Sequence, residues 1–405
     1  MPAPPWVLPL CPLVFLLKLM VSLNLPEIAQ FESINQIDPQ MWDACVGEDN
    51  PFATHAFLSA LEDSKCVHPD NGWLPQHLVL TDDTKRIIAC TPLYLKSHSY
   101  GEYVFDWSWA EAYERAGGRY YPKLLCAIPF TPVSGQRLLT HPDCNLEDKQ
   151  RLLTHLLAHA DKIGVSSLHI NFTEKAEWEV MQDLGMLGRI GHQYHWTNNH
   201  YESFDDFLNA LSSRKRKSIR KERKSVVESG ITLTTLSGPE IQEHHWDAFY
   251  DFYLDTSGRK WGHPYLNRDF FSLLGQRLGD QTVLVLALQD QCIVAGALNL
   301  KGNDTLFGRY WGCLEDYRFL HFEACYYQAI DYAIANQLKR VEAGAQGQHK
   351  IQRGYLPVET YSAHWIATPS FRNAVDDFLK HDQKVNRLEM QELMKLSPYK
   401  SDLQE

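Results

Sequence analysis

The strongest constraint on how this chain folds is an order of local patterns that occurs twice along it. In each half, two runs rich in β-forming residues flank a short polar tip, and a helical pattern and a further strand pattern follow. The expected hairpins are His77 to Leu95 and Val283 to Gly302, and the expected helices are Glu147 to Gly164 and His321 to Gln337. The strands after the helices read VSSLHINF and RVEAG. This repeated order predicts a mixed α/β fold built from a duplicated unit.

An aromatic segment without a counterpart in the second half separates the first hairpin from the first helix. It begins at Tyr100 and reads YGEYVFDWSWAEAYERAGGRYYPKLL. Aromatic side chains pack well against a hairpin, and they also line grooves that bind substrates. Two interpretations therefore stay open for this segment, packing or an acceptor groove. In the second interpretation, Asp106 and Trp107 are candidate substrate-binding residues.

The length of the chain predicts two domains with cores of their own. At 405 residues, of which 44% are hydrophobic, it has the size and composition of an ordinary globular protein. We expect the two domains to meet near residue 200, with the first over residues 25–200 and the second over residues 201–385. Residues 386–405 are expected to form a C-terminal tail.

The first 24 residues are an anomaly of composition. Residues 6–21 are almost entirely apolar, but prolines interrupt them and Lys18 breaks the run. They fall short of a membrane-spanning helix, and neither a basic start nor a small-residue cleavage site marks a signal peptide. We expect residues 1–24 to be an extension that is disordered or, because Met20 follows so closely, not translated. The sequence thus predicts no integral membrane span.

Charge and cysteine content narrow the classes of partner. A formal net charge of −11 argues against a general DNA-binding surface, because wide basic surfaces are what neutralise phosphates. Any phosphate site must therefore be local. The nine cysteines are scattered and contain no C-x-x-C pair. Such a pattern is typical of reduced thiols in a cytoplasmic protein and gives no indication of a metal site.

The largest local departure from the acidic background is a basic stretch, which is expected to form a helix over residues 212–229. Between Arg214 and Lys224 there are eight basic residues, and only Glu222 is acidic. On a helix, three arginines fall on one face and three lysines form a neighbouring stripe. A charge run is often a solvated face, but this one also indicates a groove for a phosphate chain or the acceptor end of a tRNA. The candidate anion-binding residues are Arg216, Arg220 and Arg223.

The segment GAQGQHKIQRG, which begins at Gly344, is where chemistry is expected, because its glycines let the backbone bend at a strand end. His349 is the candidate general base, since an unperturbed imidazole is partly neutral at pH 7. Glu342 is expected either to orient His349 or to act as the base itself. Lys350 and Arg353 are three residues apart, a spacing that suits a clamp on a phosphate or carboxylate. The alternative is a glycine-punctuated turn with solvated cations.

A second group of candidates lies on the strand pattern FGRYWG. Arg309 alternates there with Phe307 and Trp311, on a strand that is expected to be central in its sheet. A buried arginine needs an anionic partner, which is either a carboxylate of the protein or the ligand. Arg309 and Trp311 are therefore candidate substrate-binding residues, with an internal ion pair as the alternative for Arg309.

The chain resembles the FemAB-like family, described as peptidoglycan biosynthesis/recognition, within the GNAT acyltransferase superfamily. The strings that carry the resemblance occur in the order NPFATHAFLSALE, YYPKLLCAIPFTPVSGQRLL, LSSRKRKSIRKERK, SGRKWGHPYLNRDFF and GAQGQHKIQRGYLP. The resemblance implies two tandem GNAT-like domains and an N-acyltransferase that moves an acyl or aminoacyl group to an amine. It implies acyl-CoA or aminoacyl-tRNA as the donor, with no tightly bound cofactor. It also implies a small molecule or a cell-wall precursor as the acceptor.

One departure from the superfamily concerns the donor. A typical GNAT acetyltransferase has a Gln/Arg-x-x-Gly-x-Gly/Ala loop after its central strand, and the backbone amides of this loop hold the pyrophosphate of coenzyme A. In this chain the connection reads GRYWGCLEDYRFLHFEACYY, without a glycine after Gly312. The departure draws attention to aminoacyl-tRNA as a donor. It also supports the alternative of a non-catalytic protein that binds an anionic cell-wall precursor or a nucleotide on the same fold.

Overall fold

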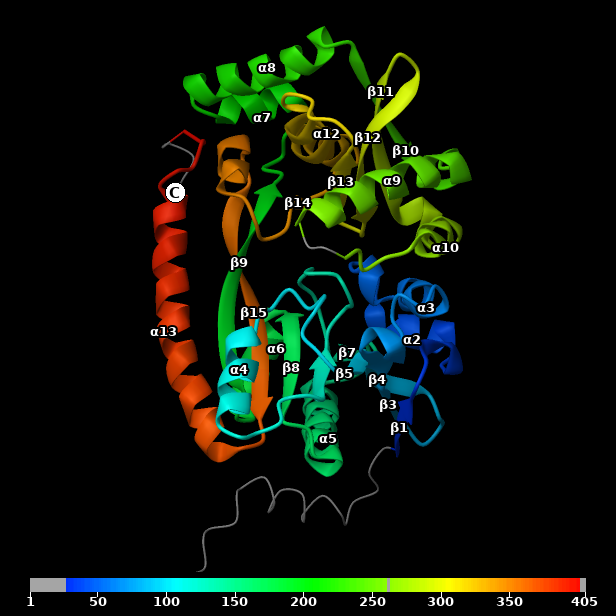
Figure 1. Cartoon of the computed structure of the whole chain (residues 1–405), viewed down its shortest axis with the longest axis vertical. Coiled ribbons are helices and arrows are strands. Elements are labelled where there is room, and N and C mark those ends of the chain that lie inside the picture. Colours follow the sequence, from blue (N-terminus) through cyan, green and yellow to red (C-terminus); the bar gives the residue numbers. More distant parts are fainter. Residues whose placement is uncertain (1–26, 261–262, 401–405) are drawn as a thin grey trace, which may run out of the picture.

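The computed structural model describes residues 27–260 and 263–400, which form a mixed α/β fold (Figure 1). Its largest element is an eleven-stranded sheet that both halves of the chain build together. In spatial order the strands are β10 (Ile231–Ser237), β11 (Thr282–Gln289), β12 (Cys292–Lys301), β13 (Thr305–Cys313), β14 (Arg340–Glu342), β9 (Leu187–Thr197), β15 (Leu356–Ile366), β8 (Ser167–Thr173), β6 (Lys123–Cys126), β5 (Leu93–Lys96) and β2 (Trp73–Pro75). The expected mixed α/β class is confirmed.

The two halves meet in the middle of this sheet, where their strands interleave. β15 comes late in the chain, but it lies between β9 and β8. It pairs with β9 from Leu356 opposite His195 to His364 opposite Leu187. Each half also contains one parallel pair with a helix in the connection, β6 with β8 and β13 with β14. In each pair, the second strand, β8 or β14, is the strand that the repeated sequence pattern placed after a helix.

Both predicted hairpins are present. β11 and β12 are antiparallel and joined at Asp290 and Gln291, whose φ angles of 50° and 68° suit a two-residue turn. The other hairpin belongs to a separate four-stranded sheet of order β1 (Glu27–Phe31), β3 (His77–Thr81), β4 (Ile87–Thr91) and β7 (Leu139–Thr140). After Pro92 the chain continues as β5 in the large sheet, so the run His77 to Leu95 contributes to two sheets.

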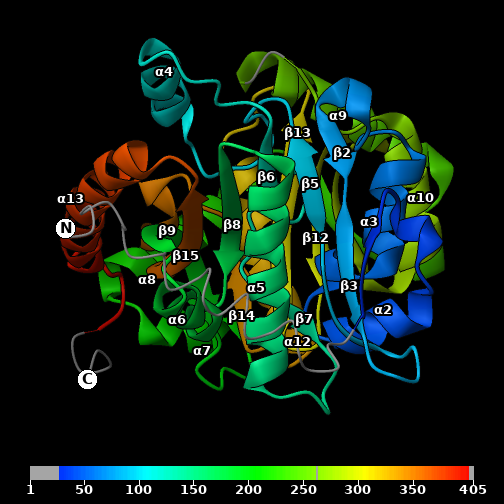
Figure 2. The ribbon, with the colours of Figure 1, turned by 90° about the horizontal axis from the view of Figure 1, so that it is seen from below.

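Helices surround the large sheet (Figure 2). They are α2 (Pro39–Val46), α3 (His55–Asp63), α4 (Trp107–Arg115), α5 (Leu146–Ile163), α6 (Lys175–Asp183), α7 (Phe204–Ala210), α8 (Ser213–Glu228), α9 (Glu243–Lys260), α10 (Arg268–Leu278), α11 (Leu320–Phe322), α12 (Gln328–Ala335) and α13 (Pro369–Met394). The predicted helix over residues 147–164 is α5, which Asn145 caps and Gly164 ends in the left-handed region. The basic helix expected over residues 212–229 is α8. The predicted helix over residues 321–337 overlaps α11 and covers a π-helical turn (Glu323–Tyr327) and α12.

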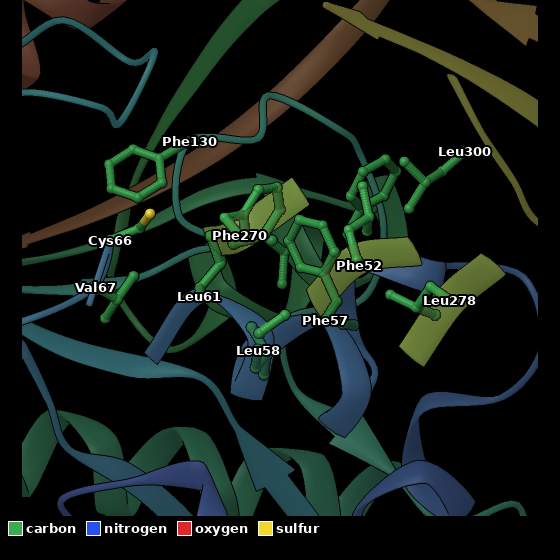
Figure 3. Close-up of a cluster of buried hydrophobic side chains, with 14 of the residues drawn as sticks. Phe52, Phe57, Leu58, Leu61, Cys66, Val67, Phe130, Phe270, Leu278 and Leu300 are labelled. Carbon is green, nitrogen blue, oxygen red and sulfur yellow. The ribbon is translucent and has the colours of Figure 1, made fainter. Parts of the chain in front are cut away.

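Aromatic side chains from both halves share the largest hydrophobic core (Figure 3). Phe52 meets Phe307 of β13 with ring centroids 5.3 Å apart, and Phe57 meets Phe270 of α10 at 5.8 Å, both edge to face. Burying a phenylalanine side chain stabilises a fold by about 1.5–3 kcal/mol, so these contacts hold the halves together. The sheet and this core both continue across residue 200, and the division into two domains at that point stays a prediction.

The C-terminal part of the chain is a long helix. α13 runs along β9 and β15 at one edge of the molecule (Figure 1, left) and buries Val375, Leu379 and Leu393. Residue 386, where a tail was expected to begin, lies inside this helix, because apolar residues at helical spacing keep it packed against the sheet. The extension expected over residues 1–24 lies outside the described residues. In residues 27–260 and 263–400, no helix is both long and apolar enough to cross a membrane.

Candidate active site

The parallel strands β13 and β14 separate after three residues, and a pocket occupies the opening. They pair only where Thr305–Phe307 meets Arg340–Glu342. β13 then continues to Cys313, while the chain after β14 turns away at Ala343. The pocket has a volume of about 700 Å³, the size of many small-molecule sites. Residues 308–311 line it on one side and residues 343–347 on the other.

Both halves of the chain contribute to this pocket. Its other walls come from residues 103–105, from β9 and β15, from α9 and from the π-helical turn after β13. The described lining residues include no aspartate or glutamate, although the chain carries a net charge of −11. The lining cations and histidines are Arg189, Arg309, Lys350, His192, His263, His321 and His349. The charge of this lining favours an anionic ligand.

Arg309 reaches the pocket through an irregularity in β13. The register between β12 and β13 skips one residue at Arg309, which is therefore an extra residue in the ladder. Such a bulge re-aims side chains, so the simple alternation of Phe307, Arg309 and Trp311 expected from the sequence is wrong. Phe307 faces the shared core, whereas Arg309 and Trp311 both line the pocket. Among the described residues no carboxylate forms an ion pair with Arg309, so the internal ion pair is not found.

Glu342 lies at the end of β14, directly behind the pocket lining. Its side chain is 4% exposed, and Oε2 has no hydrogen-bond partner in the described part of the chain. Arg340 Nε lies 3.6 Å from Oε1, and His195 Nε2 lies 3.9 Å from Oε2. Burial raises the pKa of Glu342 to about 7, against the opposing effect of Arg340 and Arg309. A carboxyl group with such a pKa can exchange a proton near neutral pH.

His349 lies in the pocket lining, on the turn that was predicted to carry chemistry. Its Nε2 is 3.0 Å from the hydroxyl oxygen of Tyr326, a residue of the π-helical turn. Gly347 makes room for the ring, since a Cβ at Gly347 would lie 2.5 Å from His349 Cε1, and its φ of 102° favours glycine. The contacts therefore connect His349 with Tyr326, and Glu342 with His195 and Arg340. These contacts do not support the expectation that Glu342 orients His349. The role of Glu342 as a base stays a prediction.

Lys350 and Arg353 both have partners within the protein. The Lys350 ammonium donates to the carbonyl oxygens of Ala343 and Gly344 and so fastens the turn after β14. Arg353 donates to both carboxylate oxygens of Glu222 at 3.0 Å and lies outside the pocket lining. The expected two-cation clamp is therefore not assembled, because Glu222 already neutralises one of its members. A ligand contact of Lys350, which does line the pocket, stays a prediction.

Asp106 and Trp107 lie beside the pocket and not in its lining. Asp106 is buried and accepts a hydrogen bond from Lys123 of β6. Trp107 begins α4, is 39% exposed and meets Tyr100 edge to face. The segment just before them, residues 103–105, lines the pocket instead. Residues of the expected loop thus line the pocket, and substrate binding by Asp106 and Trp107 stays a prediction.

The three candidate arginines of α8 contact neighbouring elements, whereas three of its lysines face solvent. Arg223 bonds to Glu323 and Asp331, Arg220 to Asp205, and Arg216 to Asn209. Lys217, Lys221 and Lys224 are exposed. The predicted anion-binding face therefore has its arginines largely occupied by acidic and amide groups of the protein. Binding of an anion by these arginines stays a prediction.

Sequence reasoning missed the tyrosines of the pocket and the network behind one of its walls. The tyrosines are Tyr103, Tyr253, Tyr265, Tyr310 and Tyr326. They come from separate segments that only the fold brings together, so no local pattern marks them. The network centres on Lys123, which bonds to Glu102 at 2.8 Å and to Asp106. A lysine inside the apolar run KLLC was a usable signal, because a buried lysine requires carboxylate partners.

The fold is of the mixed α/β class, with one large sheet built by both halves of the chain and a pocket where β13 and β14 separate. The chain belongs to the FemAB-like family, described as peptidoglycan biosynthesis/recognition, whose family model matches residues 33–401. Membership supports the acyl or aminoacyl transfer that the resemblance implied. No curated protein matches the chain in sequence.

Solved structures share the fold at low sequence identity. The structure of FemX is 11% identical, with a TM-score of 0.55 over 86% of this chain and 100% of that chain. The C-terminal domain of a putative lysylphosphatidylglycerol synthetase from Agrobacterium fabrum is 10% identical, with a TM-score of 0.51 over 84% and 95%. L-PGS from Bacillus licheniformis is 10% identical, with a TM-score of 0.50 over 82% and 98%. At these low sequence identities, the similarities show that the chains share a fold.

Proposed function

We propose that the pocket between β13 and β14 transfers an acyl or aminoacyl group from an activated donor to an amine, with His349 as the proton acceptor. The observation that carries this proposal is the position of His349, whose ring lines the pocket next to the Tyr326 hydroxyl at 3.0 Å. An unperturbed imidazole is partly neutral at pH 7 and can accept a proton from an amine. Burial raises the pKa of Tyr326, so its hydroxyl stays protonated and can fix the ring by hydrogen bonding.

In the proposed reaction the amine nitrogen of the acceptor attacks the carbonyl carbon of the donor. A carbon–nitrogen bond forms, and the bond between that carbon and the oxygen or sulfur of the donor breaks. The amine gives up one proton to His349, and the leaving group departs with the bonding electrons and takes up one proton, which the protonated His349 returns. Glu342, with its pKa at about 7, is a second group that can hold a proton behind the lining. Correct placement of these groups contributes much of the acceleration in such reactions.

The donor in this proposal is an aminoacyl-tRNA, with acyl-CoA as the alternative. The superfamily cradle for coenzyme A uses free backbone amides at the start of the helix after the central strand. At that position the amides of Leu320, Phe322 and Glu323 donate to the carbonyl oxygens of Tyr317 and Phe319. These amides are therefore already occupied. The exposed lysines of α8 provide a basic surface that suits the phosphates of a tRNA.

The acceptor in this proposal is an amine of a cell-wall precursor. Support comes from the family description, peptidoglycan biosynthesis/recognition. The pocket volume of about 700 Å³ holds a small molecule or one end of a larger precursor, and not a folded partner.

The test is a donor panel with direct detection of the product. The purified protein is incubated with a peptidoglycan precursor that bears a free amine, together with either acetyl-CoA or tRNA charged with one labelled amino acid. Mass spectrometry then measures the mass gained by the precursor. We expect a gain of one aminoacyl residue with a charged tRNA. A gain with acetyl-CoA alone would assign the other donor, and no gain with any donor would contradict the proposal.

A further inference from the structure

We propose that Arg309 forms an anion subsite in the pocket, and that the acceptor is an amine that also carries a carboxylate or phosphate group. The inference rests on the acyl transfer proposed above and adds the chemical class of the acceptor. Its basis is an arginine that a β-bulge turns into a pocket without giving it a carboxylate partner.

The guanidinium of Arg309 has hydrogen-bonding capacity that the protein does not use. Nη2 donates to the carbonyl oxygen of Phe130 at 2.6 Å. Nε is buried and has no acceptor among the described residues. An arginine has five N–H donors in a planar fork that matches two oxygens of a carboxylate or phosphate. A buried donor without an acceptor is costly. Arg309 also lines the pocket, so a ligand oxygen can bond to the part of the guanidinium that the pocket exposes.

The charge of Arg309 is also not neutralised by an ion pair. The two other cations of the lining have partners in the protein: Arg189 pairs with Asp382 at 3.3 Å, and the Lys350 ammonium is held by carbonyl oxygens. The charge of Arg309 lowers the pKa of Glu342, but the two side chains form no ion pair. Because burial keeps Glu342 partly protonated near pH 7, it does not fully neutralise the guanidinium. An anionic ligand group would complete the pairing that a half-buried cation requires.

A tyrosine hydroxyl in the same pocket lining adds a neutral donor of the kind that binds oxyanions. Tyr103 lines the same pocket, and its hydroxyl makes no hydrogen bond within residues 27–260 and 263–400. Tyr103 and Arg309 line the same pocket, and burial raises the pKa of Tyr103, so its hydroxyl stays protonated. A hydroxyl that stays protonated can donate to a carboxylate or phosphate oxygen. In the proposed subsite, Arg309 supplies the charged donors and Tyr103 a neutral one.

The test measures anion binding by wild-type protein and variants, with inorganic phosphate and acetate as separate probes. Dissociation constants come from the rise in melting temperature with ligand concentration, at an ionic strength held constant with sodium chloride. We expect one of the probes to bind wild-type protein and the control Arg318→Gln equally, because Arg318 is exposed and lies outside the lining. We expect Arg309→Gln to raise the dissociation constant at least tenfold. The probe that binds distinguishes a phosphate-bearing from a carboxylate-bearing acceptor.

Two further variants separate the subsite from a merely structural role of Arg309. Arg309→Lys keeps a charge and a donor for Phe130 but loses the fork, so we expect weakened anion binding in a folded protein. Tyr103→Phe removes one hydroxyl and leaves the Phe130 contact intact, and we expect it to raise the dissociation constant several-fold.

The inference is overturned if wild-type protein binds neither anion, or if Arg309→Gln binds both as well as wild-type protein does. Its failure can be told apart from failure of the proposed function. Anion binding that depends on Arg309, without transfer from any donor, contradicts the transfer reaction alone. Transfer in which Arg309→Gln leaves the KM of the acceptor unchanged contradicts the subsite alone.

Discussion

At the scale of single residues, two buried carboxyl groups next to the pocket differ in whether a cation donates a hydrogen bond to them. Burial raises the pKa of both Glu102 and Glu342 to about 7. Glu102 receives a hydrogen bond from the Lys123 ammonium at 2.8 Å, whereas Arg340 Nε lies 3.6 Å from the Glu342 carboxyl and makes no hydrogen bond with it. A buried carboxyl group with a raised pKa lowers the stability of the fold at neutral pH. Such groups are common at sites where a side chain accepts or donates protons. At neutral pH, Glu342 therefore lowers the stability of the fold, while its pKa of about 7 allows it to exchange a proton.

The pH dependence of stability tests this description of Glu342. The native state holds a proton on Glu342 up to a pKa of about 7, whereas the unfolded chain loses it at the ordinary value of 4.5. Its contribution is therefore fully present below pH 4.5 and is lost as the pH rises through 7. Glu342→Gln stays neutral, so we expect its unfolding free energy relative to wild type to rise by roughly 3 kcal/mol between pH 4.5 and 8.

Urea unfolding of both proteins at several pH values measures this difference. Glu114→Gln, on the exposed side of α4, is the matched control and should show no such pH-dependent difference from wild type. A constant difference between Glu342→Gln and wild type across this range would show that Glu342 is charged in the native protein at neutral pH.

At the scale of elements, the wall of the pocket formed by residues 103–105 is fastened at both of its ends. Lys123 of β6 is fully buried and bonds to Glu102 on one side and to Asp106 on the other. Burial alone would lower the pKa of Lys123, but these carboxylates raise it, so the ammonium stays charged. The Arg189 guanidinium adds a bond of 2.8 Å to the carbonyl oxygen of Phe105. The buried Lys123 ammonium thus fastens this wall at both ends, and Arg189 holds it between them.

Replacement of Lys123 should loosen the wall. Lys123→Met leaves Glu102 and Asp106 buried without their counter-charge, which costs about 3–5 kcal/mol when one partner of a buried pair is removed. We expect lower stability and faster hydrogen exchange in residues 99–107, measured by mass spectrometry. Lys175→Met, at a lysine whose side chain is 64% exposed, is the control and should leave both unchanged. Wild-type exchange in residues 99–107 of Lys123→Met would refute the fastening role.

The sequence predicted those elements that a local pattern determines. The hairpins follow from their strand periodicity, and α5 and α8 follow from helical patterns that end at Gly164 and Gly230. His349, Lys350, Arg309 and Trp311 were expected in the site and do line the pocket. Other features depend on contacts between distant segments and left no local pattern. The bulge at Arg309 depends on the register with β12. Arg353 is occupied by Glu222, which lies 131 residues earlier in the chain.

At the scale of the whole molecule, the two repeats are joined more closely than two separate domains would be. β15 lies between two strands of the first half, and the largest core contains aromatic residues from both halves. The pocket also takes its walls from both halves. Because the halves share a sheet and a core, we expect them to lose structure together.

This expectation can be tested with Phe57→Ala. Phe57 is 4% exposed and packs on Phe270, and removal of a buried phenylalanine side chain costs about 3–5 kcal/mol. Hydrogen exchange in increasing urea should show that peptides of β4 and β12 lose protection at the same, lowered concentration. Phe378→Ala, at a side chain that is 42% exposed on α13, is the control and should have a small effect. Wild-type protection of β12 in Phe57→Ala would mean that the halves unfold independently.

The most direct test of the central claim is the turnover number of His349→Ala in the transfer reaction. If His349 accepts the proton in the pocket between β13 and β14, kcat should fall by about 10²–10⁴-fold, the usual contribution of a general base. The melting temperature should stay close to that of wild type, and His381→Ala, at an exposed histidine of α13, should keep full turnover. A folded His349→Ala protein that turns over at the wild-type rate would contradict the account.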